Sequence, residues 1–243
     1  MKYRYDLHIH SCLSPCGEDT MTPATVAGMA KLNGTDMIAL TDHNTSRNCP
    51  AFRTACEFYG LIPLFGMELT AAEDVHLICL FDNLEDALAF NDWVDERRMR
   101  YKNKPDIFGR QLIMNEDDEV IGEEDDLLIN ATSVSIDEAY EKVTEMGGAC
   151  YPAHIDRDAN GIVAMLGAFP TEPHFSAYEL NDADDRVQMI EQYPHIADLA
   201  YLVCSDAHYV RDIPENANSI DLPDDIPPAS AMIRMLRGEG RDK

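Results

Sequence analysis

Short apolar segments recur along this chain, and most of them end on a histidine or a carboxylate. The clearest examples are DLHIH at 6–10, DMIALTDH at 36–43, ACYPAH at 149–154 and YLVCSDAH at 201–208. Helical patterns lie between such segments, and Ser135 and Glu138 have the spacing of a capping box that opens one of them. Strands that alternate with helices imply a parallel sheet covered by helices. The pattern therefore predicts an α/β fold, with the sheet rolled into a barrel.

One region interrupts this alternation. Residues 101–134 contain QLIMNEDDEVIG, which predicts a hairpin around an acidic turn, followed by the acidic connection EEDDLLINATS. The whole chain has 243 residues, a common length for one large α/β domain. We therefore expect a single domain over residues 1–243, with 101–134 inserted into it as a small subdomain or lid over the barrel mouth.

Composition limits the partners and the compartment. With 19 Lys and Arg against 45 Asp and Glu, the formal net charge is −26, which disfavours broad contact with a phosphate backbone. On that ground we expect no duplex nucleic acid as a partner. No apolar stretch reaches the roughly 18–20 residues that span a bilayer, so we expect no membrane contact. The N-terminus lacks a signal-peptide pattern, and the seven cysteines form no regular framework, so we predict a cytoplasmic protein.

The histidines and carboxylates gather where an α/β site would be. His8 and His10 are two residues apart on a predicted strand, so their side chains share a face. In α/β barrels the active site lies at the C-terminal ends of the strands. The other polar residues at or beside predicted strand ends are Asp42, His43, Glu68, His154, Asp206 and His208. His76 differs, because it begins its strand instead of ending it.

Imidazoles and carboxylates on separate strands can bind several divalent ions, with a carboxylate bridging two of them. Such ions lower the pKa of bound water toward neutrality and stabilise a phosphoryl displacement. The motifs GxxxxGK[ST] and GxGxxG are both absent from the chain, which disfavours a nucleoside triphosphate or dinucleotide cradle. The residues by themselves therefore favour metal-dependent hydrolysis.

Six ordered segments carry a family resemblance: DLHIHS (6–11), ALTDHN (39–44), GME (66–68), VHLICLF (75–81), YPAHIDR (151–157) and CSDAH (204–208). In this order and spacing they resemble the polymerase and histidinol phosphatase (PHP) family. The resemblance implies a distorted (β/α)7 barrel with three divalent metal ions (Zn, Mn or Fe). It implies that His8, His10, Glu68 and Asp206 hold the first ion, that Glu68, His76 and His154 hold the second, and that His43, His208 and one further residue hold the third.

The further ligand of the third ion is where this chain departs from the family. The family pattern has an Asp or His five or six residues after the HxH pair, whereas this chain has the longer segment SPCGEDTMTP. Counting back from Thr22 and Pro23 favours Glu18. Asp19 is the neighbouring alternative, and Cys16 lies at the right count from His10.

Two other residues have predicted roles beside the metals. Asp42 is expected to hold a ligating imidazole rather than an ion, because metal-bound histidines usually donate their second N–H to a carboxylate or carbonyl. Arg157 is the candidate phosphate clamp, since a guanidinium matches phosphate oxygens in bidentate fashion. The alternative for Arg157 is a surface ion pair with Asp156 or Asp158.

The function that follows is a metal-dependent phosphoesterase. It would hydrolyse a small phosphomonoester, either a nucleotide or a sugar-like phosphate, by means of a metal-bound hydroxide. A short oligonucleotide is a further candidate substrate. Two alternatives remain open: a metal-dependent amide or lactone hydrolase, because fold does not fix substrate, and a non-catalytic regulatory module stabilised by metal.

Overall fold

The computed structural model describes residues 1–240. The strands are β1 (Lys2–Asp6), β2 (Met37–Leu40), β3 (Ile62–Thr70), β4 (His76–Phe81), β5 (Leu112–Met114), β6 (Val120–Glu123), β7 (Ala149–Pro152), β8 (Ala177–Leu180), β9 (Ala200–Val203) and β10 (Asn218–Asp221). The α-helices are α1 (Pro23–Leu32), α2 (Cys49–Tyr59), α3 (Leu84–Asp95), α4 (Pro105–Phe108), α5 (Ile136–Glu145), α6 (Ile162–Leu166), α7 (Arg186–Gln192) and α8 (Pro228–Leu236). Among the described residues, no helix is both long and apolar enough to cross a bilayer.

The sequence signals for helix ends act as expected. Thr22 caps α1 by accepting the Thr25 N–H at 3.2 Å, and α5 starts with the predicted capping box of Ser135 and Glu138. Helix α3, which follows β4, ends at Asp95. The side chain of Arg98 then turns back to Asp95, at 2.9 Å.

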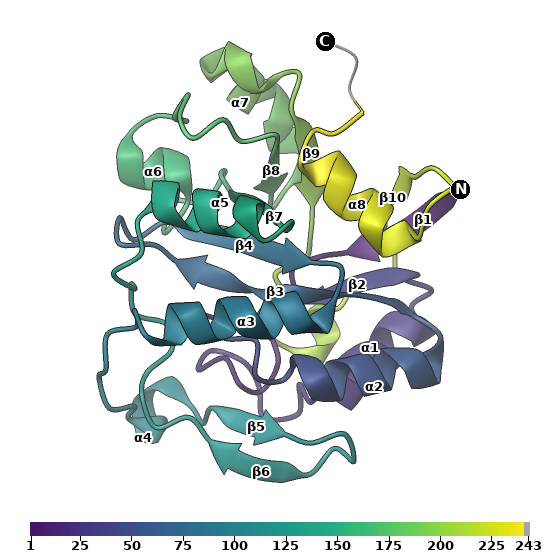
Figure 1. Cartoon of the computed structure of the whole chain (residues 1–243), viewed down its shortest axis with the longest axis vertical. Coiled ribbons are helices and arrows are strands. Elements are labelled where there is room, and N and C mark those ends of the chain that lie inside the picture. The colour runs from purple at the N-terminus through teal and green to yellow at the C-terminus, as the bar shows by residue number, and fades with distance from the viewer. Residues whose placement is uncertain (241–243) are drawn as a thin grey trace.

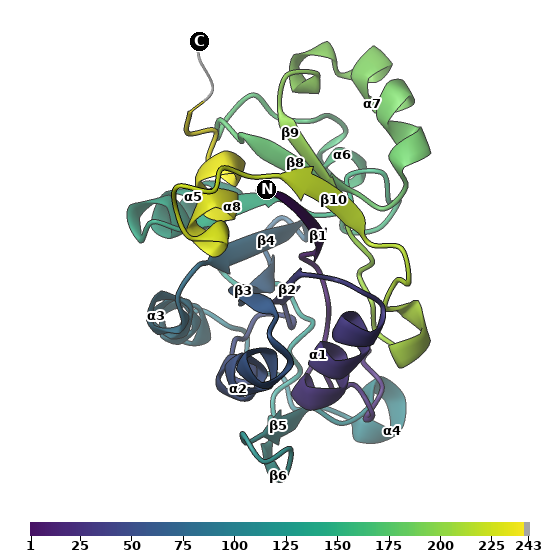
Figure 2. The same ribbon diagram turned by 90° about the vertical axis from the view of Figure 1, so that its right-hand side faces the viewer.

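The main sheet has six strands in the order β10-β1-β2-β3-β4-β7. A separate parallel pair, β8-β9, completes the curl (Figure 2). Contacts that join the pair to the sheet include a parallel bridge from Ile9 to Ala207 and a hydrogen bond from the Ile155 N–H to the Glu179 carbonyl at 2.9 Å. The mixed α/β fold with a curled sheet confirms the predicted class, but the sheet does not consist of seven repeated parallel units.

The direction of β4 is the main departure from an all-parallel barrel. β4 runs antiparallel to both β3 and β7. The physical reason is the short connection from Thr70 to His76, because parallel neighbours need a crossover of about a dozen residues or more. Reversal brings the N-terminal end of β4 to the edge where β1, β2 and β3 end. His76 therefore begins its strand and still lies at the same end of the sheet as the other histidines.

Two apolar layers hold the curled sheet. Alternate strand residues face outward, where Ile38 and Leu40 pack with the helices that cover the sheet (Figure 1). The intervening residues, such as Met37 and Ala39, face inward and pack with Met232 of α8. Helix α8 lies beside the N-terminus of β1 in both ribbon views, so it closes the end of the sheet opposite the histidines.

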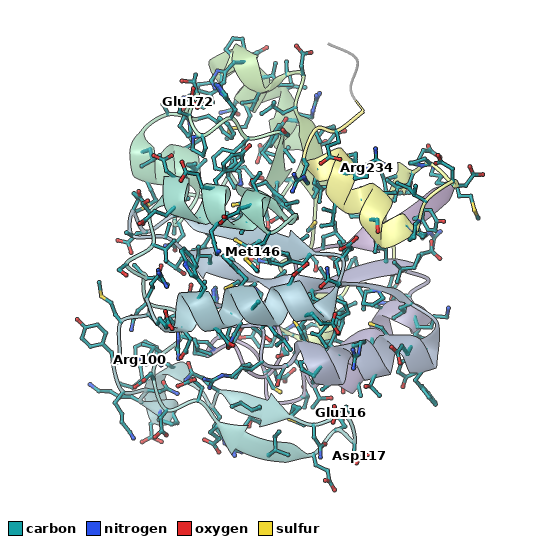
Figure 3. The ribbon with its side chains drawn as sticks, in the orientation of Figure 1. Arg100, Glu116, Asp117, Met146, Glu172 and Arg234 are labelled. Carbon is teal, nitrogen blue, oxygen red and sulfur yellow. The ribbon has the colours of Figure 1, made fainter. Side chains whose placement is uncertain are left out.

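The inserted segment 101–134 forms α4 and the predicted hairpin, in which β5 pairs antiparallel with β6. Figure 1 places both at the lower end of the molecule, and Figure 3 shows Glu116 and Asp117 at the outer tip of the hairpin. Leu112 and Met114 pack in a small buried cluster with Cys12 and Ala51. The segment is thus attached to the loop that follows β1, close to the first histidine pair.

Candidate metal centre

Six of the eight histidines meet at one end of the curled sheet around one carboxylate. Glu68, on β3, is 1% exposed and lies within 3.4 Å of a ring nitrogen of each of five histidines. These are His8, His10, His43, His76 and His154. The sixth, His208, stacks on His10 with ring centroids 4.1 Å apart. A buried carboxylate among so many nitrogen donors has the geometry of a bridging ligand.

The two histidines of the first pair are held in defined orientations. The Nδ1 atom of His8 lies 2.7 Å from Oε1 of Glu179, and that of His10 lies 2.9 Å from Oγ of Ser14. If Nδ1 carries the proton, both Nε2 atoms present lone pairs, and these atoms are only 3.1 Å apart. Facing lone pairs repel one another, and either a proton on one ring or a shared metal cation removes that repulsion. The arrangement therefore fits a bound metal ion.

Asp42 contacts the serines that follow this histidine pair rather than the histidines themselves. Its carboxylate accepts the Ser11 N–H, the Ser11 hydroxyl and the Ser14 hydroxyl, each at 2.7 Å. Because Ser14 donates to Asp42, its oxygen is left to accept from His10 Nδ1. Asp42 thus acts on His10 through Ser14. It belongs to none of the donor groups described next.

Among residues 1–240, three groups have donor atoms that all lie within 4.8 Å of one another: His8–His10–Glu68–Asp206, His43–Glu68–His76 and His10–His43–His208. The first, here called the inner group, has the composition expected for the first ion. The groups share members, and His10 has only Nε2 free, so it can serve one ion. Assigning His10 to the inner group leaves His43 and His208, here called the outer pair, in need of another ligand.

Several buried nitrogen and oxygen atoms of the cluster form no well-aligned hydrogen bond among residues 1–240, although some lie within 3.0 Å of a neighbouring carboxylate or imidazole. They include Nδ1 of His43, His76 and His154, and Oδ1 of Asp206. His154 and Asp206 also have positive φ angles, 24° and 49°, a backbone conformation that costs about 1–3 kcal/mol and clusters at functional sites. Unpaired buried donors on a strained backbone fit a group that supplies the missing contacts, and divalent cations match this donor set.

Charges within the cluster shift its pKa values. Burial opposes ionisation of Glu68, but His76, His8 and His43 together hold its pKa well below the usual range. Burial also opposes the charged form of His10, yet hydrogen bonds to Asp206 and Glu68 outweigh it and raise its pKa to about 9. The pKa of His43 falls to about 4 and that of His208 to about 3, chiefly through burial. The outer pair is therefore already deprotonated at neutral pH.

The structure does not bring Glu18 to the cluster. Its side chain is exposed, and only its backbone is close, with the N–H donating to the carbonyl of His208 at 3.0 Å. Asp19 is exposed and lies 3.8 Å from Arg110. Cys16 is less exposed, and its pKa is raised by burial and then by the charges of Glu68 and Asp206, which places the thiol within their field. The ligand that completes the outer pair stays a prediction.

Arg157 lies at the edge of the cluster with 41% of its side chain exposed. It donates to Oδ2 of Asp206 at 2.5 Å and to Oδ1 of Asn181 at 3.1 Å. The expected alternative, an ion pair with Asp156 or Asp158, is not what forms, because Asp156 accepts the backbone N–H groups of Asn181 and Asp182. Arg157 thus orients a candidate ligand and remains partly free to meet an anion.

Glu179 is the site residue that sequence reasoning missed. It lies on β8, is 1% exposed and contacts His8 as described above. A charged residue within the buried strand AYEL was the available signal, because a carboxylate is almost never buried without a partner. Its partner comes from residue 8, at the opposite end of the chain, so local pattern could not name it.

The fold and the donor cluster define an α/β protein suited to hold divalent metal ions at one end of a curled sheet. A model of the PHP domain matches residues 6–157, which is more than half of the chain. The chain therefore belongs to the PHP domain family, as its motifs predicted.

Comparisons with individual proteins are more distant. An uncharacterized protein of Streptococcus pneumoniae is 28% identical over 80 residues, which is 29% of this chain and 31% of that protein. Among solved structures, a protein from Bifidobacterium adolescentis described as a metal-dependent phosphoesterase has a TM-score of 0.58 at 20% identity, covering 95% of each chain. An amidohydrolase from Chromobacterium violaceum, solved with sulfate, has a TM-score of 0.57 at 16% identity, covering 91% of this chain and 92% of the other.

One comparison corrects an expectation. Endonuclease Q, solved with a 27-mer duplex that carries an abasic lesion, has a TM-score of 0.64 at 18% identity, and the match covers 99% of this chain. The chain spans only 58% of that protein's length. The expectation that excluded duplex nucleic acid is wrong, because a protein that shares this fold binds a duplex. Net charge summed over a chain does not describe the surface around one site.

Proposed function

We propose that this protein is a metal-dependent phosphoesterase that hydrolyses a small phosphomonoester, a nucleotide or a sugar-like phosphate. The observation that carries the proposal is the buried inner group, in which His8 and His10 are both oriented with Nε2 toward the carboxylates of Glu68 and Asp206. Two or more divalent ions, one at the inner group and the others at the neighbouring donors, would supply Lewis acidity and water of lowered pKa. The family and the phosphoesterase neighbour support the same reaction class.

The chain's own residues have separate tasks in this reaction, which adds water across a P–O bond and releases an alcohol and phosphate. Glu179 and Ser14 hold His8 and His10 in the orientation that ligation needs. Arg157 holds Asp206 and offers its exposed N–H groups to a phosphate oxygen. The deep burial of the inner group keeps bulk water from weakening these charge interactions.

The test is turnover of a phosphoester panel by protein loaded separately with Mn²⁺, Fe²⁺ and Zn²⁺. We expect phosphate release from at least one phosphomonoester, and we expect Glu68→Gln to abolish it. Glu57→Gln, an exposed change on α2, is the matched control. A protein that holds its metals and hydrolyses no phosphoester would refute the proposal and leave either an amide or lactone hydrolase or a non-catalytic metal-stabilised module.

A second candidate is metal-dependent hydrolysis of an amide or lactone. It is favoured by the structural likeness to a protein described as an amidohydrolase. Cyclic amides and lactones belong in the same panel, and strong turnover of these with none of phosphate esters would select this candidate.

A further inference from the structure

The loop that follows β2 carries both a donor of the metal centre and an attachment point of the inserted segment. The donor is His43, one residue of the outer pair, and the residue after it is Asn44, which is 1% exposed. Because the two residues are adjacent, any contact that fixes the backbone of Asn44 also limits the position of His43. The contacts of this loop therefore bear directly on the outer pair.

The ring of His43 depends on its backbone for its orientation. The rings of the inner histidines are each held by a partner outside the cluster, but among residues 1–240 no such hydrogen bond holds the ring of His43. Its Nδ1 lies 3.0 Å from Oε2 of Glu68, which belongs to the cluster itself. The backbone of His43 is fixed instead, because its N–H donates to Oγ of Ser14 at 3.2 Å and the residue forms a parallel bridge with Glu68.

Asn44 uses its backbone and its side chain to join β3 to the inserted segment. Its N–H donates to the carbonyl of Glu68 at 2.9 Å, and its Oδ1 accepts the Thr70 N–H at 2.8 Å. Its Nδ2 donates to the carbonyls of Leu128 and Asn130 at 2.6 and 2.9 Å. One buried amide thus connects the insertion to the strand that carries the bridging carboxylate and to the loop that carries the outer donor.

Asparagine suits this position for two reasons. Its φ is 52°, in the left-handed region that Asn tolerates better than most residues other than glycine. The amide also supplies both kinds of group that are needed here, since its N–H donors meet two carbonyls and its oxygen meets an N–H. Aspartate would keep only the acceptor, and glycine would keep only the backbone conformation. These two substitutions therefore separate the contacts of Asn44.

The insertion has further attachments that do not involve Asn44. Asn48 holds β5 by donating to the carbonyl of Leu112 at 3.1 Å. Arg47 pairs with Glu124, just after β6, at 2.6 Å. Loss of the Asn44 contacts should therefore free only the connection that follows β6, while the hairpin stays in place.

We propose that Asn44 is a positioning residue that couples the inserted segment to the outer metal position. Docking of residues 128–130 on Asn44 fixes the loop that directs His43, so docking favours an ion at the outer pair. By thermodynamic linkage, an ion at the outer pair favours docking by the same factor. The inserted segment is in this way a structural part of the metal centre.

The inference deepens the proposed function, because it names the segment that regulates the outer side of the same site. Its tests measure ion binding and hydrogen exchange instead of turnover. The coupling can therefore fail in a protein that hydrolyses phosphoesters, and it can hold in one that hydrolyses none.

The first experiment needs no substitution. Hydrogen exchange of the full chain is followed by mass spectrometry in the metal-free state and after each successive equivalent of Zn²⁺ or Mn²⁺. We expect peptides that cover residues 127–132 to exchange about five-fold or more slowly once the last equivalent is bound. Peptides from the hairpin at 112–123 should change little and serve as the internal control. Unchanged exchange of 127–132 at every equivalent would overturn the coupling.

The second experiment titrates metal into Asn44→Gly, with Asn130→Ala as the matched control, because Asn130 meets Asn44 through its carbonyl and not through its side chain. We expect Asn44→Gly to bind the last equivalent about five-fold or more weakly, to bind the earlier equivalents normally and to exchange faster at 127–132. The control should match the parent in all three. Asn44→Asp, which keeps the acceptor for Thr70, should also exchange faster at 127–132.

Two results with these variants would contradict the proposal. Faster exchange at 127–132 in Asn44→Gly without loss of affinity for the last ion would show that docking and ion binding are independent. Equal weakening of every ion would show a general loss of structure in place of a specific effect on the outer pair.

Discussion

The inner group and the outer pair use the same residue types in different surroundings. His8, His10 and Glu68 are fully buried, and both imidazoles are oriented by a partner outside the cluster. His208, in contrast, is partly exposed and orients itself on the carbonyl of Asp206 at 2.8 Å. Burial and fixed orientation favour tight binding of an ion, whereas exposure favours exchange and contact with substrate. We therefore predict that the inner group binds its ion more tightly than the outer pair does.

The largest effect on turnover and stability is expected at Glu68, which belongs to the inner group and also contacts His43 of the outer pair. Replacing it with Gln removes the charge that faces five imidazoles and leaves only Glu179 and Asp206 to balance buried positive charge on His8 and His10. We expect loss of turnover below detection, and loss of about 3–5 kcal/mol in the free energy of unfolding of the metal-free protein. Elemental analysis, phosphate release and urea unfolding measure these effects. A Glu68→Gln protein that keeps the metal content of the parent would contradict the central role of this carboxylate.

The next effect tests why the inner group binds tightly. Glu179→Gln keeps the size of the side chain but removes the negative charge behind His8. Outer partners of this kind are worth about 10–100-fold in metal affinity, so we expect a loss of that order in a competition assay with a chelator. Glu145→Gln, an exposed change at the end of α5, is the control. An unchanged metal affinity would mean that His8 binds the ion equally well without a negatively charged partner at its Nδ1 atom.

The third prediction concerns the further ligand that would complete the outer pair, for which Cys16 and Glu18 are candidates. Cys16 is less exposed than Glu18, so we expect Cys16→Ser to weaken the most loosely bound ion by about ten-fold or more and Glu18→Gln to leave it unchanged. Zinc and manganese titrations should show this as a change in the last equivalent only, with the inner group unaffected. The reverse result would show that the turn at 15–18 rearranges when the ion binds and brings Glu18 inward.

The smallest expected effect is the release of protons when a metal ion binds. In the metal-free protein the pKa of His10 is raised to about 9, whereas those of His43 and His208 are lowered. At pH 7.5 an ion that enters the inner group must displace the proton of His10, and an ion at the outer pair displaces none. Calorimetry in buffers of different ionisation enthalpy should detect release of about one or more protons with the first ion, with affinity rising as pH approaches 9. Absence of proton release would show that the inner histidines are neutral before the ion binds.

The motifs indicated which donors lie close together where the donors follow their own strands. DLHIHS, ALTDHN and CSDAH each place a donor at a strand end, and that relation is local, because strand period and strand end are set by neighbouring residues. The prediction was weakest where spacing alone had to decide. The segment SPCGEDTMTP favoured Glu18 by counting, but the structure folds it as a turn whose backbone, not its carboxylate, meets His208. Counting residues cannot give the direction in which a loop side chain points.

The sequence by itself determined which donors this protein has, their order on strands and helices, and the family to which it belongs, because residue chemistry and local periodicity are written along the chain. Tertiary structure alone decided that β4 runs backwards and so delivers His76 to the cluster. It also decided that Glu179 contacts His8 and that Leu112 and Met114 of the inserted segment pack on Cys12, in the loop after β1. The physical reason is that these features are contacts between distant segments, whose free energy depends on connection length and packing in three dimensions.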